Sequence, residues 1–116
     1  MNTDTYNGYT NKETWLVRLW LDNDEYSQEY VLQGVMDSYR TDVPSATLAN
    51  YLRNMVETAN PETEASLYAD LIRCVLHRIN FRELADSYIN DYANEVLAWS
   101  ANLLIGLSLL VACLLA

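Results

Sequence analysis

The last 21 residues of the chain, VLAWSANLLIGLSLLVACLLA, contain no charged side chain. All 23 Asp, Glu, Lys and Arg residues precede this segment, which runs from Val96 to Ala116. As a helix that rises 1.5 Å per residue, it would extend about 31 Å, close to the roughly 30 Å hydrocarbon core of a bilayer. A helix in a soluble core rarely runs this long without a charge. The pattern therefore favours a transmembrane span over a sixth packed helix or an exposed apolar end.

Particular side chains within this segment suit a membrane helix. Trp99 fits the interfacial region, and Asn102 lies nearer the headgroups than the midplane. Gly106 follows Asn102 on one stripe of the helix, and Ser108 and Ala112 lie on a neighbouring stripe of small residues. Because small residues let two helix backbones approach closely, these stripes predict a weak homodimer through the membrane helix.

The flanking charges predict the orientation. Arg78 and Arg82 lie within twenty residues upstream of the span, and no base follows it, which places the N-terminal side in the cytoplasm. The N-terminus has neither the basic nor the apolar region of a secretory signal. We therefore expect a single-pass tail anchor, with residues 1–95 as an acidic cytoplasmic domain and residues 96–116 as the span.

The first 95 residues predict an all-α bundle of about five helices, since apolar residues recur at helical spacing and no alternating runs indicate a hairpin. Capping patterns mark three helix starts: Thr10 with Glu13, Asn60 with Pro61, and Asn80 with Glu83. The first predicted helix ends near residue 22. The other four run over about 24–40, 45–59, 61–79 and 80–92. Gly34 is costly inside a helix and indicates a close helix crossing.

The apolar stripes predict which side chains form the core. The first helix is apolar over roughly 240° of its girth, so we expect it to be buried centrally, with Trp15 and Trp20 inside. The fourth helix is expected to face the core with Tyr68, Leu71, Ile72, Val75, Leu76 and Ile79. In the second helix, the residues that recur at helical spacing are Tyr26, Tyr30, Val31, Val35 and Tyr39.

Two segments resemble an uncharacterised family of small proteins carried by phages, plasmids and other mobile elements. NKETWLV at residues 11–17, followed by LWL and ND, is similar to the opening of the family, and INFRELA at 79–85 is similar to its closing segment. The resemblance covers roughly residues 6–92. It implies a mobile-element context and no established activity, and the apolar tail departs from the family pattern.

Catalytic and metal-binding patterns are sparse. Asp70, Cys74 and His77 share one helix face, but spacing alone is a weak pattern, and we expect a solvated polar face there. His77 is the only histidine and is poorly oriented to activate Cys74. The three glycines are too far apart for a phosphate-binding loop. We therefore expect a non-enzyme without cofactor or metal.

The net charge of −9 restricts the partners. Direct nucleic-acid binding is disfavoured because it requires a basic patch, and 16 acids outnumber 7 bases. Four carboxylates, those of Asp22, Asp24, Glu25 and Glu29, fall within eight residues. They either solubilise the domain or imitate the phosphate array of DNA.

These patterns predict a non-enzymatic interaction protein of mobile-element type, held at the cytoplasmic face of a membrane and acting on an unknown host or phage partner. The alternative is a soluble, acidic DNA mimic that inhibits a host nucleic-acid-binding or defence protein, with the tail packed on the first helix. The partner-binding candidates lie on the first helix and the acidic turn after it: Trp15, Arg18, Trp20, Asp22, Asp24, Glu25 and Glu29.

Overall fold

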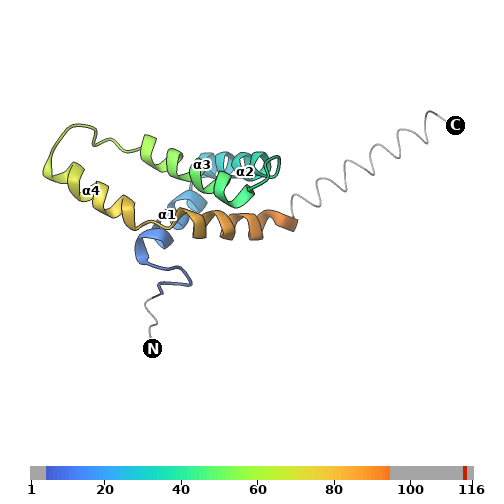
Figure 1. The fold of residues 1–116 in the computed structure, drawn as a ribbon, viewed down its shortest axis with the longest axis horizontal. Helices are drawn as coiled ribbons and strands as arrows, with labels where there is room; N and C mark the ends of the chain where they lie inside the picture. Colours follow the sequence, from blue (N-terminus) through green and yellow to red (C-terminus); the bar gives the residue numbers. More distant parts are fainter. Residues whose placement is uncertain (1–4, 95–113, 115–116) are drawn as a thin grey trace.

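The computed structural model describes residues 5–94 and 114, and the described part of the chain contains five helices and no strand (Figure 1). The helices are α1 (Lys12–Asn23), α2 (Glu25–Ser38), α3 (Pro44–Thr58), α4 (Leu67–Arg78) and a fifth helix over residues 81–94. The predicted all-α class is confirmed. Among these residues no helix combines the length and the apolar character that crossing a membrane requires. The predictions for Trp99, Asn102, Gly106, Ser108 and Ala112 lie outside the described residues.

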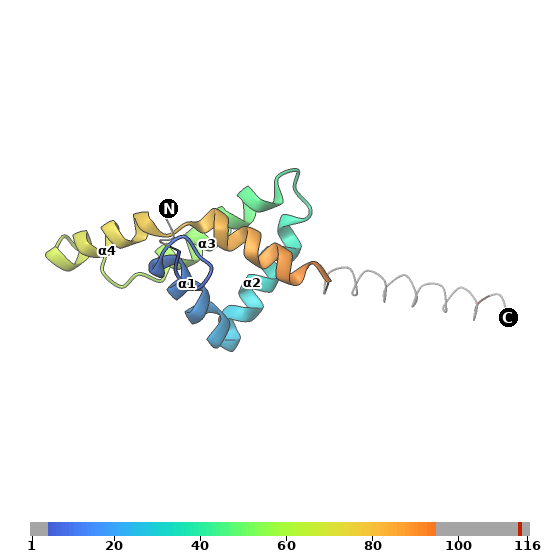
Figure 2. The same cartoon turned by 90° about the horizontal axis from the view of Figure 1, so that it is seen from below.

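The core lies where α2, α3 and the 81–94 helix meet (Figure 2). Its fully buried side chains come from all three helices: Val31 and Val35, Leu48 and Leu52, and Leu84 and Tyr88. Gly34 allows α3 to approach α2, because a Cβ atom at this position would lie 2.5 Å from Cε1 of Tyr51. The predicted close crossing at Gly34 is therefore confirmed.

The start of α1 differs from the prediction. Asn11, not Thr10, is the N-cap, and its Oδ1 accepts hydrogen bonds from the N–H (2.9 Å) and the hydroxyl (2.6 Å) of Thr14. Thr10 donates instead to the Glu83 carboxylate, through its N–H and its hydroxyl, both at 2.9 Å. The capping-box prediction for Thr10 was wrong because a partner 73 residues away binds its hydroxyl.

The 81–94 helix is capped by Asn80 as predicted, but the Glu83 side chain does not bind the N–H of Asn80 in return. Oδ1 of Asn80 accepts from the N–H of Glu83 at 3.0 Å, so the cap is confirmed. The N–H of Asn80 donates to the hydroxyl of the buried Thr14 at 2.9 Å, while the Glu83 side chain binds Thr10. These contacts fasten the beginning of the chain and α1 to the start of the last described helix.

The fourth helix begins six residues later than predicted, at Leu67. Oδ1 of Asn60 accepts from the N–H of Glu62, two residues on, so Asn60 forms a turn instead of a cap, and Ser66 caps α4. The helix extends away from the other helices (Figure 2). Its apolar stripe is consequently exposed at Tyr68, Leu71 and Val75, and the predicted burial of these side chains was wrong.

Candidate partner-binding surface

The outer face of α1 is open to solvent. Leu16, Leu19 and Trp20 are exposed, with Trp20 at 69%, and the buried residues of the helix are Thr14 and Leu21. The prediction of central burial was therefore wrong. The helix lies at the edge of the core because α2, α3 and the 81–94 helix supply most of the buried residues.

Trp20 borders a shallow, mainly apolar pocket of about 310 Å³ between the end of α1 and the end of α3. Met55 and Ser27 line this pocket and also a second pocket, of about 440 Å³, between α2 and α3. Because the two pockets share these residues, they form one continuous surface.

Three tyrosines extend that surface along α2 and α3. Tyr26 and Tyr30 are exposed, and their ring centroids lie 5.5 Å apart with the planes inclined at 36°. Tyr51 joins them in lining a smaller pocket of about 250 Å³, together with Glu29 and Gln33. We name this region the aromatic surface, defined by Trp20, Tyr26, Tyr30, Tyr51 and Met55.

Tyr51 is held in place from two directions. Its hydroxyl donates to the backbone oxygen of Tyr30 at 2.7 Å, and its ring lies against α2 at the side-chain-free Gly34. Burial raises the pKa of Tyr51, and the nearby negative charge of Asp37 raises it further. On the α3 side of the aromatic surface, the Tyr51 ring is therefore held by these contacts, and the negative charge of Asp37 lies near it.

The charges around the aromatic surface are negative. Glu29 lines the smallest pocket, and no Lys or Arg lines any of the three pockets among the described residues. Glu25 is also exposed, at the start of α2. Asp24 is the N-cap of α2, and hydrogen bonds from the hydroxyl and the N–H of Ser27 lower its pKa. Asp24 therefore has a structural role in addition to its charge.

Arg18 and Asp22 lie on the other side of α1 and are engaged internally. Arg18 donates from Nε to Asp22 and from Nη2 to Asp91, each at 2.7 Å, and from Nη1 to Ser87 at 2.6 Å. Its guanidinium lies 3.9 Å from the ring centroid of Tyr88, whose hydroxyl donates to Asp22 at 2.8 Å. Burial and this hydrogen bond raise the pKa of Tyr88 well above its usual value.

Trp15 is not part of the aromatic surface, because its ring packs against the N-terminal turn. It is half-buried, and its ring lies 5.1 Å from that of Tyr6 at an angle of 57°. Tyr6 pairs with Tyr9 across a tight turn in which Asn7 and Gly8 both have positive φ. The structure thus places Trp20, Glu25 and Glu29 at or beside the aromatic surface and directs Trp15, Arg18 and Asp22 elsewhere.

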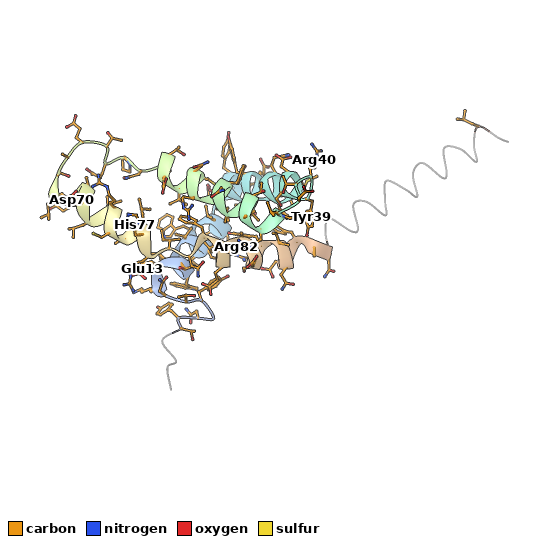
Figure 3. All side chains as sticks on the ribbon, in the orientation of Figure 1. Glu13, Tyr39, Arg40, Asp70, His77 and Arg82 are labelled. Carbon is orange, nitrogen blue, oxygen red and sulfur yellow. The ribbon has the colours of Figure 1, made fainter. Side chains whose placement is uncertain are left out.

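The face of α4 with three potential ligands is solvated as predicted. Asp70 and His77 lie on this projecting helix (Figure 3), and Asp70 pairs with Arg73 at 3.1 Å. Cys74 is exposed. Among the described residues, no group of three or more His, Cys, Asp or Glu side chains is arranged to hold a metal ion.

Sequence reasoning missed the central residues of the surface. Their helical spacing groups Tyr26 and Tyr30 with Val31 and Val35 in one apolar pattern of the second helix. At about 100° per residue, however, the two tyrosines are centred roughly 140° from the two valines around the helix. That angular separation was the available indication that the tyrosines face outward.

The fold and the surface define a small all-helical domain with an exposed aromatic face edged by carboxylates. The chain belongs to DUF7249, a family of unknown function, whose model matches residues 2–96. No curated protein and no solved structure matches the chain. The predicted membership of an uncharacterised family is confirmed, and the mobile-element context stays a prediction.

Proposed function

We propose that this protein is a non-enzymatic interaction protein of a mobile element, which binds a host or phage protein through the aromatic surface. The observation that carries the proposal is the joint exposure of Trp20, Tyr26 and Tyr30 beside a core that closes without them. Buried Trp and Tyr side chains supply much of the free energy of protein–protein binding. Contiguous exposed apolar area of this kind is typical of an interaction site.

We further propose that residues 96–116 hold this domain at the cytoplasmic face of a membrane, as a tail anchor. The support is the uncharged length of the segment and the two arginines upstream of it. Two such spans would associate weakly along the Ser108 and Ala112 stripe. A membrane location raises the effective concentration of the aromatic surface toward a membrane-associated partner.

The rival function, imitation of DNA by the acidic turn, receives less support. Asp22 is bound by Arg18 and Tyr88, and Asp24 caps α2. Glu25 and Glu29 are the two carboxylates of the four that form no hydrogen bond or ion pair with another described residue. A mimic needs an extended array of free charges, and half of this array is engaged in holding the fold.

Capture of partners by full-length protein tests the proposal. The protein is expressed in the host with a cross-linkable tag, and the parent is compared with Trp20→Ala and Tyr26→Ala. Tyr68→Ala is the matched control, because Tyr68 and Tyr26 are both 69% exposed but lie on different helices. We expect the two surface variants to lose a partner that the control retains. Equal capture by all four proteins would contradict the proposal, and displacement of the partner by duplex DNA would favour the rival.

Fractionation of the same cells tests the anchor separately. We expect the full-length protein to sediment with membranes and to resist carbonate and high-salt washing. Recovery in the supernatant would contradict the anchor while leaving the aromatic surface open to test.

A further inference from the structure

We infer that Tyr26, Tyr30 and Tyr51, with Glu29, form an open cage for the guanidinium group of an arginine on the partner. This inference rests on the proposed interaction function and specifies the chemistry that the surface recognises. Tyr26, Tyr30, Tyr51 and Glu29 all line one open pocket of about 250 Å³. A ring face attracts a cation that lies within roughly 6 Å of its centroid, so a cation bound in this pocket can be attracted by more than one ring.

The charges of the pocket select a cation. Glu29 contributes a carboxylate to the lining, and Asp37 lies near Tyr51 and accepts a hydrogen bond from Gln33 at 3.0 Å. No base lines the pocket or the two neighbouring pockets among the described residues. An anionic ligand would therefore be repelled and a cationic one attracted.

Other aromatic rings of the protein show the same preference, and their cations come from the chain itself. Arg18 lies over Tyr88 at 3.9 Å, Arg53 over Phe81 at 5.3 Å, and Lys12 over Tyr6 at 5.8 Å. In the described part of the chain no Lys or Arg lies over the three tyrosines of the cage. The cage is therefore an aromatic and acidic site whose cation has to be supplied from outside.

The geometry favours arginine over lysine. Guanidinium is planar, stacks on aromatic faces and is more weakly hydrated than ammonium, so it loses less hydration on entering an open aromatic pocket. Tyr51 is fixed by its hydrogen bond to Tyr30 and by its contact with Gly34, and it presents a preformed wall. Tyr26 and Tyr30 line the same pocket and are more exposed than Tyr51.

The test measures binding of a fluorescent glycine–serine peptide that carries arginine to the full-length protein in uncharged detergent. The matched peptide carries citrulline, which has the shape of arginine without its charge. We expect citrulline to weaken binding about 10-fold, the factor that a cation–π contact and one charge interaction together supply. The corresponding lysine peptide should bind less tightly than the arginine peptide.

Two surface variants and two matched controls locate the site. Tyr26→Leu keeps apolar area but removes the ring, and should weaken arginine binding by about 3-fold, and Glu29→Gln should weaken it by about 3-fold as well. Tyr68→Leu and Glu64→Gln make the same chemical changes at exposed positions outside the cage and should leave binding unchanged. Equal affinity for the arginine and citrulline peptides, or equal losses in variants and controls, would overturn the cage.

This outcome is distinguishable from failure of the proposed function. If the cage variants bind the peptides like the parent but Trp20→Ala loses its cellular partner, the interaction function stands and the cage is wrong. If arginine binds in the cage but no partner depends on Trp20 or Tyr26 in cells, the cage stands and the proposed function is wrong.

Discussion

Replacing Arg18 with Met separates a structural role of this residue from the partner-binding role that the sequence predicts. The substitution removes ion pairs to Asp22 and Asp91, a hydrogen bond to Ser87 and the contact with the Tyr88 ring. The Arg18 side chain is 15% exposed, whereas the two carboxylates are 40% and 50% exposed. Solvent therefore screens the ion pairs, and we assign them about 0.5–1 kcal/mol each.

The remaining contacts add to this loss. A hydrogen bond from a charged donor contributes about 1.5 kcal/mol and the cation–π contact about 1 kcal/mol, while the Met side chain recovers part of the packing. We expect Arg18→Met to lower the free energy of unfolding by about 3 kcal/mol, a large part of the roughly 5–15 kcal/mol of a small domain. The midpoint of thermal unfolding should fall by about 12–24 °C.

Thermal and urea unfolding of the full-length protein, followed by circular dichroism, measure the change. Arg40→Met is the matched control, because the Arg40 side chain is exposed just after the end of α2 (Figure 3) and forms no hydrogen bond, ion pair or ring contact with another described residue. It should change the stability by less than about 0.5 kcal/mol. An Arg18→Met protein as stable as the parent that fails to bind its partner would refute the structural role.

Three further predictions follow from the packing. Residues 1–94 alone should be soluble, helical and cooperatively folded, and aggregation or a non-cooperative melt would contradict the two-part organisation. Because the pKa of Tyr88 is raised by burial and by its bond to Asp22, the folded state keeps this proton above about pH 10, where the unfolded chain loses it. The contribution of Tyr88 to the free energy of unfolding is therefore fully present below about pH 10 and is lost as the pH rises above it. In urea titrations between about pH 9 and 11, Tyr88→Phe should lose less stability than the parent. Gly34→Ala should lower the free energy of unfolding by about 1–3 kcal/mol because the new methyl group displaces Tyr51, and the better helix propensity of Ala offsets about 1 kcal/mol of this loss. A variant with both an unchanged melting midpoint and unchanged arginine binding would contradict the close contact between Gly34 and Tyr51.

Local patterns in the sequence predict the helices better than they predict what each helix covers. The bounds of the second and third helices and the cap at Asn80 follow from periodicity and from the residues that stop or start a helix. The Asn60-Pro61 pattern fails, because an Asn oxygen can bind the N–H two residues on as well as cap a helix. Local sequence does not choose between these two bonds.

Contacts between distant residues are the part that the sequence could not give. Thr14 bonds to Asn80, Thr10 to Glu83 and Arg18 to Asp91, pairs separated by 66 to 73 residues. These contacts decide that one side of α1 is covered and that its Trp20 side is open. The acidic and aromatic character of the surface was predictable from Trp20 and Glu29, whereas the contribution of Tyr51 required the crossing of α2 and α3.

The distribution of the bases explains why the aromatic surface carries an uncompensated negative charge. Six of the seven Lys and Arg residues are engaged within the fold, in these contacts: Lys12 with Tyr6, Arg18 with Asp22 and Asp91, Arg53 with Phe81, Arg73 with Asp70, Arg78 with Glu13, and Arg82 with Asp86. None of them lines the pockets around Tyr26 and Tyr30. The surface therefore keeps the field of Glu25 and Glu29, which attracts a basic segment before contact. At physiological ionic strength, salt limits the reach of that field to about 8 Å. The charges therefore act mainly on the rate of association, while the aromatic rings hold the bound arginine.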